Sequence, residues 1–119
     1  MIISTLKIFP LHEKRQEVLD TLQSVMGPAQ ALPGCLSCSL SEEVGGAQGI
    51  LYIEQWRSLP ELELHVKSSN YGRILEAMEM STQVPEVCFY EQSASWNLDL
   101  VERVRNQKHQ NDFMFKESV

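Results

Sequence analysis

The chain has 119 residues, enough for one domain whose folding buries roughly two-thirds of the surface of the unfolded chain. Its composition, 43% hydrophobic and 22% charged residues, is typical of globular proteins and excludes global disorder. With a formal net charge of −6 and only ten scattered lysines and arginines, it lacks the clustered positive charge that a nucleic-acid partner requires.

The first half of the chain carries strand and helix patterns in turn. Residues 1–9 predict a strand with apolar side chains on both faces, and Pro10 stops it. Residues 12–26 predict a helix because apolar side chains recur at helical spacing. We expect Gly27-Pro28 to end or kink this helix, since proline cannot donate to the helical hydrogen bonds.

Two strands joined by a glycine-rich connection follow. Residues 35–44 alternate apolar and serine side chains, and residues 50–56 combine β-branched, aromatic and aliphatic side chains. The connection at residues 45–49 contains glycines, which tolerate the positive φ angles of hairpin turns. A β-hairpin is therefore predicted here.

The strand at residues 50–56 runs directly into a helix, and we expect a functional site near this junction. Ser58 and Glu61 predict a capping box at the start of the helix. The helical pattern is interrupted near residues 68–70 and then resumes with the strongest helical periodicity in the chain. The residues of that periodic set are Tyr71, Ile74, Leu75 and Met78.

The last part of the chain predicts a fourth strand at residues 87–94. Asn97 is a candidate cap for a short amphipathic helix. The polar residues 107–119 are expected to fray or to dock on a neighbour. We therefore divide the chain into a domain at residues 1–96 and a C-terminal segment at residues 97–119.

The order of elements, β-α-β-β-α-β, predicts an α+β fold of the ferredoxin-like type, an antiparallel sheet with both helices on one face. The first, third and fourth strands nevertheless carry apolar residues on both faces. One layer of helices covers only one of those faces. We therefore expect a homodimer in which two sheets face each other as a dimeric α+β barrel.

The cysteines and the hydropathy indicate where the protein acts. An odd number of cysteines, without a secretory signal at the N-terminus, fits a reducing compartment. No apolar run approaches the ~20 residues that span a bilayer, so we expect a cytoplasmic protein with no membrane partner. Cys35 and Cys38 match the C-x-x-C spacing of redox and zinc sites, but residues three apart on a regular strand face opposite sides. We interpret Cys38 and Cys88 as small buried side chains, and we expect no metal site.

Three short motifs resemble one known family. They are Pro33-Gly34-Cys35 before the second strand, Glu54-Gln55-Trp56 at the end of the third, and His65, Ser68 and Tyr71 at three-residue intervals in the helix. Over residues 1–94 the chain resembles the antibiotic biosynthesis monooxygenase domains, which are dimeric α+β barrels. The haem-degrading branch is excluded, because it would place tryptophan at His65 and histidine at Leu75.

The resemblance implies a monooxygenase that oxidises a small hydroquinone or phenolic substrate with O2 and uses no cofactor. His65 is the candidate catalytic base, since an imidazole can take a phenolic proton near neutral pH. Its simpler role would be a hydrogen bond to a backbone carbonyl at the helix break. Tyr71 is the second candidate catalytic residue, because its hydroxyl could orient a ligand oxygen, although most aromatics at such spacing pack in a core.

Five further residues are candidates for binding the substrate. They are Glu54, Trp56, Asn70, Met78 and Phe89. We expect the amide to orient the substrate and the ring-bearing and sulfur-bearing side chains to wall the pocket. Glu54 shares its strand parity with Trp56, so if it points inward it needs a partner such as Arg57, Arg73 or His65. An ion-paired or solvated carboxylate is the alternative.

The rival hypothesis is a non-catalytic dimer that binds a small apolar ligand or a protein partner on the same scaffold, since fold does not determine function. Substitution of His65 separates the two: an enzyme should lose turnover and keep its fold, whereas a binding protein should change its affinity at most modestly. A third hypothesis is that the segment after Ala94 caps the pocket or the dimer.

Overall fold

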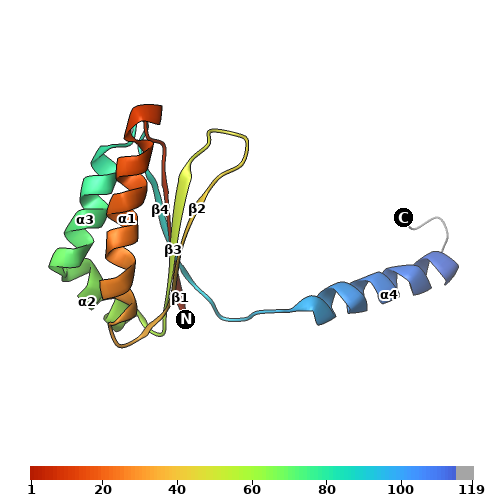
Figure 1. Ribbon diagram of the computed structural model, residues 1–119. Helices are drawn as coiled ribbons and strands as arrows, with labels where there is room; N and C mark the ends of the chain where they lie inside the picture. Colours follow the sequence, from red (N-terminus) through yellow and green to blue (C-terminus); the bar gives the residue numbers. More distant parts are fainter. Residues whose placement is uncertain (115–119) are drawn as a thin grey trace.

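The computed structural model describes the backbone of residues 1–114 and the side chains of residues 1–107. Four antiparallel strands form one sheet in the order β2-β3-β1-β4. The strands are β1 (Ile2–Ile8), β2 (Cys35–Glu42), β3 (Ile50–Trp56) and β4 (Glu86–Glu91). The helices of the body are η1 (His12–Lys14), α1 (Arg15–Gln30), α2 (Leu59–Lys67) and α3 (Ser69–Glu79). Helices α1, α2 and α3 lie together on one face of the sheet (Figure 1), which confirms the predicted α+β, ferredoxin-like arrangement.

The two central strands, β1 and β3, have the register that their apolar patterns require. Buried and partly exposed residues alternate along the whole of each strand. Ile2 lies opposite Trp56 and Leu6 lies opposite Tyr52, so the buried residues of both strands point to the helix side of the sheet. A slip by one residue would turn all of these side chains to the other face, which fixes the pairing.

The core lies between the sheet and helices α1 and α3. Helices contribute a buried side chain every third or fourth residue, and strands contribute every second one. The core residues are Leu6, Ile8, Val18, Leu22, Val25, Ala29, Ile50, Tyr52, Tyr71, Ile74 and Ala77. A smaller cluster of Ile2, Trp56 and Leu62 packs where α2 meets the end of β3.

A break between α2 and α3 separates the two helices at one serine. Ser68 has an extended backbone, with φ −76° and ψ 158°, and its hydroxyl accepts from the N–H of Tyr71 at the start of α3. The same hydroxyl donates to the carbonyl of His65 at 2.6 Å, near the end of α2. Ser68 thus ends one helix and begins the next, as the interrupted pattern at residues 68–70 predicts.

Helix α1 does not end at Gly27-Pro28, and the predicted capping box at Ser58 is wrong. Helix α1 continues through Pro28 to Gln30, because little of the helix lies beyond the proline and the buried Ala29 holds that part against the core. Ser58 is the N-cap of α2 but forms no capping box. Its hydroxyl donates to the Glu61 carboxylate instead of accepting from the backbone.

The edge strand β4 is exposed along its whole length. Cys88 therefore lies on the surface of the single chain, contrary to its predicted burial, and Phe89 and Tyr90 are exposed beside it. Cys88 pairs with Thr5 and Tyr90 pairs with Ile3, so both turn to the sheet face opposite the body helices. Phe89 pairs with Ser4 and turns to the helix face, but α1 packs on β2 and α2 packs on β3, which leaves Phe89 exposed at the other edge of the sheet.

The C-terminal helix α4 (Leu98–Met114) is longer than predicted and stands away from the sheet and the other helices (Figure 1). Asn97 caps it as expected, since its side-chain oxygen accepts from the N–H of Asp99 at 2.9 Å. Residues 115–119, part of the segment expected to fray or dock, lie outside the described chain. No helix within the described residues, α4 included, is both long and apolar enough to cross a membrane.

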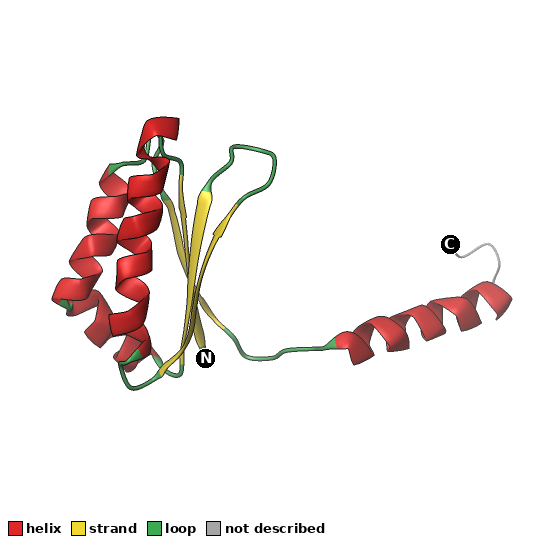
Figure 2. Ribbon diagram, in the orientation of Figure 1, coloured by secondary structure: helices red, strands yellow, loops and turns green. Residues whose placement is uncertain are grey.

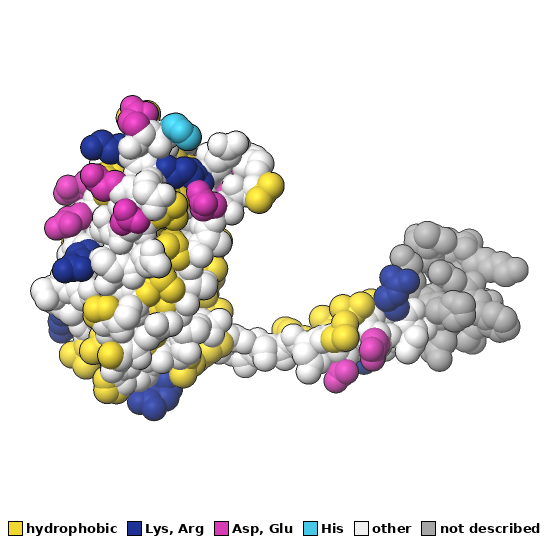
Figure 3. All heavy atoms as spheres, viewed as in Figure 1, with side chains coloured by type: hydrophobic (Ala, Val, Ile, Leu, Met, Phe, Trp, Pro, Cys, Tyr) yellow, Lys and Arg dark blue, Asp and Glu magenta, His cyan; other side chains and the backbone are white. Residues whose placement is uncertain are grey.

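Two apolar surfaces find no partner within the described part of the chain. The sheet face opposite the helices carries Ile3, Leu51 and Ile53, all partly exposed, and Figure 2 shows that the body helices lie on the other face. Helix α4 exposes Leu98 and Val101, and Figure 3 shows apolar side chains along its upper side. Both surfaces would gain stability if another molecule covered them.

Gly34 has a backbone conformation, φ +87°, that favours glycine at the turn into β2. A Cβ added there would overlap the carboxylate of Glu61, which Arg57 and Ser58 hold by hydrogen bonds. We predict that Gly34→Ala lowers the free energy of unfolding by about 2–4 kcal/mol, from backbone strain together with displacement of Glu61.

Gly45→Ala is the matched control for this prediction. Gly45 also has a positive φ, +79°, but nothing lies within 4 Å of its Cβ position. Gly45→Ala should lower the free energy of unfolding by about 1–2 kcal/mol, from backbone strain alone. Urea unfolding of both variants and the wild-type protein measures the difference, and equal losses would mean that the contact with Glu61 has no effect.

Candidate functional site

Strand β3 turns every second side chain into the layer between the sheet and the helices. Tyr52, Glu54 and Trp56 share this parity, and their exposed fractions are 3%, 1% and 0%. Tyrosine and tryptophan suit such a position, because each combines a large apolar ring with one hydrogen-bond donor. A buried carboxylate such as that of Glu54 loses its hydration and therefore needs donors from the protein.

Three donors converge on the two carboxylate oxygens of Glu54. The Tyr52 hydroxyl donates to Oε2 at 2.7 Å, and the Trp56 indole N–H donates to Oε1 at 3.0 Å. The third is His65, whose Nε2 lies 3.0 Å from Oε2. Of the three partners considered from the sequence for an inward-pointing Glu54, His65 is thus the one that it meets.

His65 reaches the carboxylate from α2, one turn before the helix break, and its side chain is 0% exposed. Its ring stacks on Trp56 with 4.9 Å between the ring centroids and meets Tyr71 in a T-shaped contact at 5.4 Å. The imidazole therefore bonds to a carboxylate, and not to a backbone carbonyl at the helix break. Two aromatic rings and one charge surround it.

The charge of Glu54 sets the protonation of its neighbours. Burial alone would raise the pKa of Glu54, but hydrogen bonds from His65, Tyr52 and Trp56 outweigh burial and hold that pKa below its ordinary value. Burial and the nearby Glu54 carboxylate raise the pKa of Tyr52 and of Tyr71. Glu54 is therefore ionised at neutral pH, and both phenols keep their protons.

An ionised Glu54 also fixes the tautomer of His65. The carboxylate has no proton to donate, so Nε2 of His65 carries the hydrogen in this contact. In a neutral imidazole Nδ1 is then an acceptor, and it is the buried side-chain atom that lacks a hydrogen-bond partner among the described residues. A base with a free lone pair, oriented by a carboxylate, can accept a proton from a ligand.

Four of the predicted site residues meet around the Glu54 carboxylate, and with Tyr52 they form what we call the Glu54 cluster. They are Glu54, Trp56, His65 and Tyr71. The other three candidates lie apart from it. The Asn70 amide donates to the carbonyl of Val25 in α1, Met78 packs on the main core, and Phe89 lies on the exposed edge strand.

Tyr52 belongs to the cluster, although it is not among the site residues predicted from the sequence. Its parity with Glu54 and Trp56 is the signal that could have found it, because alternating residues of one strand share one face. Within the described side chains, no three His, Cys, Asp or Glu residues lie where they could share a metal ion. The cluster thus presents one carboxylate, one imidazole, one indole and two phenols.

Cys35 and Cys38 turn to the same face of β2, contrary to the expectation that they point to opposite sides. A β-bulge between Cys35 and Ser37 adds one residue to the strand and reverses its parity, so Cys35 pairs with Trp56 and Cys38 with Glu54. The two sulfurs are 3.7 Å apart. Cys38 is partly exposed, not buried.

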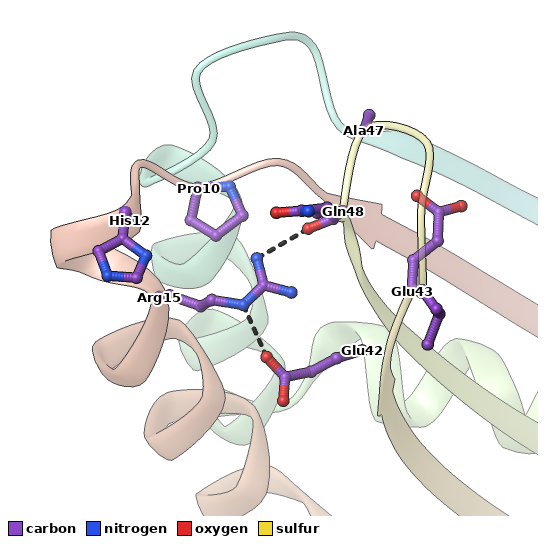
Figure 4. A pocket seen from close by; sticks show the side chains of 8 residues that line it. Pro10, His12, Arg15, Glu42, Glu43, Ala47 and Gln48 are labelled. Atoms are coloured by element: carbon purple, nitrogen blue, oxygen red, sulfur yellow. Dashed lines mark hydrogen bonds and ion pairs between the residues drawn. The ribbon is translucent and has the colours of Figure 1, made fainter.

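A polar pocket of about 370 Å³ lies at the other end of β3, between the start of α1 and the β2–β3 hairpin (Figure 4). Arg15 points into it and donates to the Glu42 carboxylate at 2.6 Å and to the Gln48 carbonyl at 2.7 Å. These contacts hold the arginine in place, and the carboxylates of Glu42 and Glu43 disfavour an anion. The pocket is therefore a weaker candidate than the Glu54 cluster.

Removal of the Glu54 carboxylate should destabilise the fold, because three buried donors would lose their acceptor. We predict that Glu54→Ala lowers the free energy of unfolding by about 3–5 kcal/mol, since each buried donor left unsatisfied costs about 1–3 kcal/mol. Glu17→Ala is the control, since its exposed contact with Lys14 is 3.8 Å long and its loss should cost at most about 0.5 kcal/mol. Urea unfolding at neutral pH measures both, and similar losses would contradict the prediction.

The contribution of the Glu54 carboxylate to stability should depend on pH. Because the folded-state pKa of Glu54 is lowered, its contribution is present above about pH 4.3 and is lost as the pH falls through the folded value. The difference in unfolding free energy between the wild-type protein and Glu54→Gln should therefore shrink below about pH 4. A difference that stays constant into that acid range would exclude this linkage.

Comparison with known proteins identifies the family of this chain. Residues 1–77 match the model of the family described as antibiotic biosynthesis monooxygenase. An uncharacterized protein of Synechocystis sp., sll1783, is 25% identical over 76 residues, which are 64% of this chain and 50% of that protein. The chain thus spans about half the length of the curated relative that it matches.

Solved structures share the fold at low identity. Rv0793 from Mycobacterium tuberculosis has a TM-score of 0.73 and 22% identity, covering 81% of this chain and 98% of that chain. A candidate antibiotic biosynthesis monooxygenase from Deinococcus radiodurans has a TM-score of 0.73 and 19% identity, covering 82% of this chain and 97% of that chain. Since the family model matches more than half of its residues, the chain belongs to the antibiotic biosynthesis monooxygenase family.

Proposed function

We propose that this protein is a cofactor-independent monooxygenase that oxidises a small hydroquinone or phenol with O2. One observation carries the proposal: the Nε2–H of His65 is held by the ionised Glu54, while its buried Nδ1 has no partner among the described residues. Membership of the family supports the reaction type. Such a substrate needs little more than removal of a phenolic proton and stabilisation of the resulting anion.

The first step would be proton transfer from a substrate hydroxyl to Nδ1 of His65. The Glu54 carboxylate would stabilise the imidazolium that forms, as a buried carboxylate does for a catalytic histidine. The electron-rich phenolate then reacts with O2, so that one oxygen atom enters the ring and the other leaves as water. For a hydroquinone the product is a hydroxyquinone, which has one oxygen more and two hydrogens fewer than the substrate.

Two aromatic residues beside His65 suit an aromatic substrate. Trp56 already stacks on the imidazole, and its ring would form one wall of the site. The raised pKa of Tyr71, caused by burial and the Glu54 charge, keeps its hydroxyl protonated. Tyr71 would therefore donate a hydrogen bond to a substrate oxygen and orient it.

The substrate reaches His65 only if the cluster opens, because that side chain is fully buried. The break at Ser68 supports a hinge, since its backbone is extended and this single residue joins α2 to α3. We propose that α2 swings at Ser68 to admit the substrate. Closure would then exclude water from the reacting anion.

The test is O2 uptake by metal-chelated protein with a panel of hydroquinones and polycyclic phenols. Uptake by the wild-type protein should saturate with substrate, and His65→Ala should lower kcat/KM by about 10²–10⁴-fold, the usual contribution of a general base. The control is His12→Ala, because His12 is exposed beside the polar pocket at the other end of the sheet. It should keep the wild-type rate.

A buried histidine can also matter for stability, so thermal unfolding of His65→Ala and of the bulkier His65→Gln accompanies the assay. Both variants should remain folded at the assay temperature and lose uptake. Uptake no greater than buffer autoxidation across the panel would overturn the proposal. Equal rates in the wild-type protein and a folded His65 variant would do the same.

A second candidate function is binding of a small apolar ligand without reaction. An apolar groove of about 370 Å³ between α2 and β4 favours it, with Leu59, Leu62, Val66 and Phe89 among its lining residues. The complete burial of His65 in the closed form also suits a protein that does no chemistry. Under this alternative there is no O2 uptake, and His65→Ala changes ligand affinity at most modestly.

We also propose that two copies pair through the sheet face opposite the helices. Ile3, Leu51 and Ile53 make the centre of this face apolar, and no element of the described chain covers it. A second sheet is the economical cover for an antiparallel sheet that has helices on one side only. The pair would form the dimeric α+β barrel implied by the family.

Ile53→Asp should convert this dimer to a monomer, because it buries an unpaired charge in the middle of the interface. Leu64→Asp is the matched control, since Leu64 is 69% exposed on α2 and does not belong to the sheet face. Sedimentation velocity at equal concentrations measures the mass of each protein. A monomeric wild-type protein, or an Ile53→Asp variant that stays dimeric, would exclude the proposed interface.

A further inference from the structure

Two thiols meet at the edge of the Glu54 cluster. The sulfurs of Cys35 and Cys38 lie 3.7 Å apart, because the bulge in β2 turns both side chains to the same face of the strand. Both residues are partly exposed, and both are free cysteines. A disulfide needs its sulfurs about 2.05 Å apart, so closure requires a movement of less than about 2 Å.

We propose that Cys35 and Cys38 are a site of reversible oxidation to an intramolecular disulfide, formed by exchange with a small-molecule disulfide. One thiolate attacks the small disulfide, which makes a mixed disulfide and releases one small thiol. The second cysteine then attacks the protein sulfur of that mixed disulfide and releases the second small thiol. The protein loses two protons and two electrons, and the small disulfide gains them as two thiols.

The position of the pair permits the movement. Strand β2 is at the edge of the sheet and pairs only with β3, so its backbone is held on one side. The bulge already interrupts that pairing between Cys35 and Ser37 and leaves Leu36 without a partner in the register. A shift here breaks fewer backbone hydrogen bonds than a shift in a central strand would.

The acidity of the thiols supports a disulfide that forms slowly and persists. Burial raises the pKa of Cys35, and burial raises the pKa of Cys38 to about 12. Few thiolates are present at neutral pH, so exchange starts slowly. Burial outweighs the contacts that would stabilise a thiolate, and it is thiolate stabilisation in the reduced form that makes some protein disulfides easy to reduce.

The pair is connected to the Glu54 cluster through Tyr52. Cys38 lies opposite Glu54 in the β2–β3 register and packs against the core cluster that contains Tyr52, whose hydroxyl donates to Glu54. Oxidation removes the S–H of Cys38, so Tyr52 loses a polar neighbour while its bond to Glu54 remains. Because Glu54 also accepts from His65, a change at Tyr52 reaches the imidazole.

The first experiment uses the full chain with Cys88→Ser, which leaves Cys35 and Cys38 as its only thiols. After equilibration with oxidised glutathione, mass spectrometry should find the protein lighter by two hydrogens, with a peptide linked between Cys35 and Cys38. Dithiothreitol should reverse the change. The double variant Cys35→Ser, Cys88→Ser is the control, and it should stay reduced or carry glutathione.

Three outcomes would overturn the proposal. They are two alkylatable thiols after oxidation of Cys88→Ser, glutathione retained on that variant at equilibrium, and disulfides formed only between molecules. None of these readouts requires a substrate or turnover. A failure of this proposal is therefore distinguishable from a failure of the proposed monooxygenase function.

The second experiment tests the connection to the cluster. NMR signals of the His65 ring, assigned by their absence in His65→Gln, should shift when Cys88→Ser is oxidised. The same treatment of Cys35→Ser, Cys88→Ser should leave them in place. Unchanged His65 signals in a protein whose disulfide is verified would exclude the path through Tyr52.

Discussion

The packing of the fold depends on one buried charge, the carboxylate of Glu54. The Glu54 carboxylate lies on a central strand, where loss of hydration costs several kcal/mol unless donors replace the water. Those donors come from two elements, Tyr52 and Trp56 on β3 and His65 on α2. The carboxylate therefore determines where α2 lies on the sheet, together with the apolar packing of Leu62. A shift of α2 that kept every apolar contact would still leave a buried charge without its third donor.

Apolar side chains would serve stability equally well at this place. Replacement of both partners of a buried polar contact by apolar groups of the same shape can be neutral or stabilising, and a buried nitrogen without a partner among the described residues, such as Nδ1 of His65, is itself unfavourable. A purely structural pair would satisfy every polar atom, whereas proton transfer needs a base with an unused lone pair and a carboxylate behind it. This contrast separates the Glu54 cluster from the polar pocket, where Arg15 is a cation paired with Glu42 and has no lone pair to accept a proton.

Local patterns predict the frame of the molecule but not the contacts that close it. Alternation locates β3 and its inward face, and the interrupted helical pattern locates the break at Ser68, because each period depends on neighbouring residues alone. The partner of Glu54 depends on how α2 packs, so several candidates are equivalent until the fold is known. No residue type in the sequence signals the bulge that turns Cys35 and Cys38 to the same face of β2. Likewise the strand of Phe89 is predictable, but its place at the uncovered edge is not.

Strand β3 serves both faces of the sheet with alternate residues. Glu54 and Trp56 turn to the helices, whereas Ile53 and Gln55 turn to the uncovered face. Hydrogen bonds to β1 and β2 hold this strand on both sides, so it is a rigid support for the carboxylate. A second copy docked on the uncovered face would restrain β3 further and leave α2, which ends at the extended Ser68, as the element free to move. If both proposals hold, assembly and opening would lie on opposite faces of one strand, and the dimer interface would stay closed while the cluster opens.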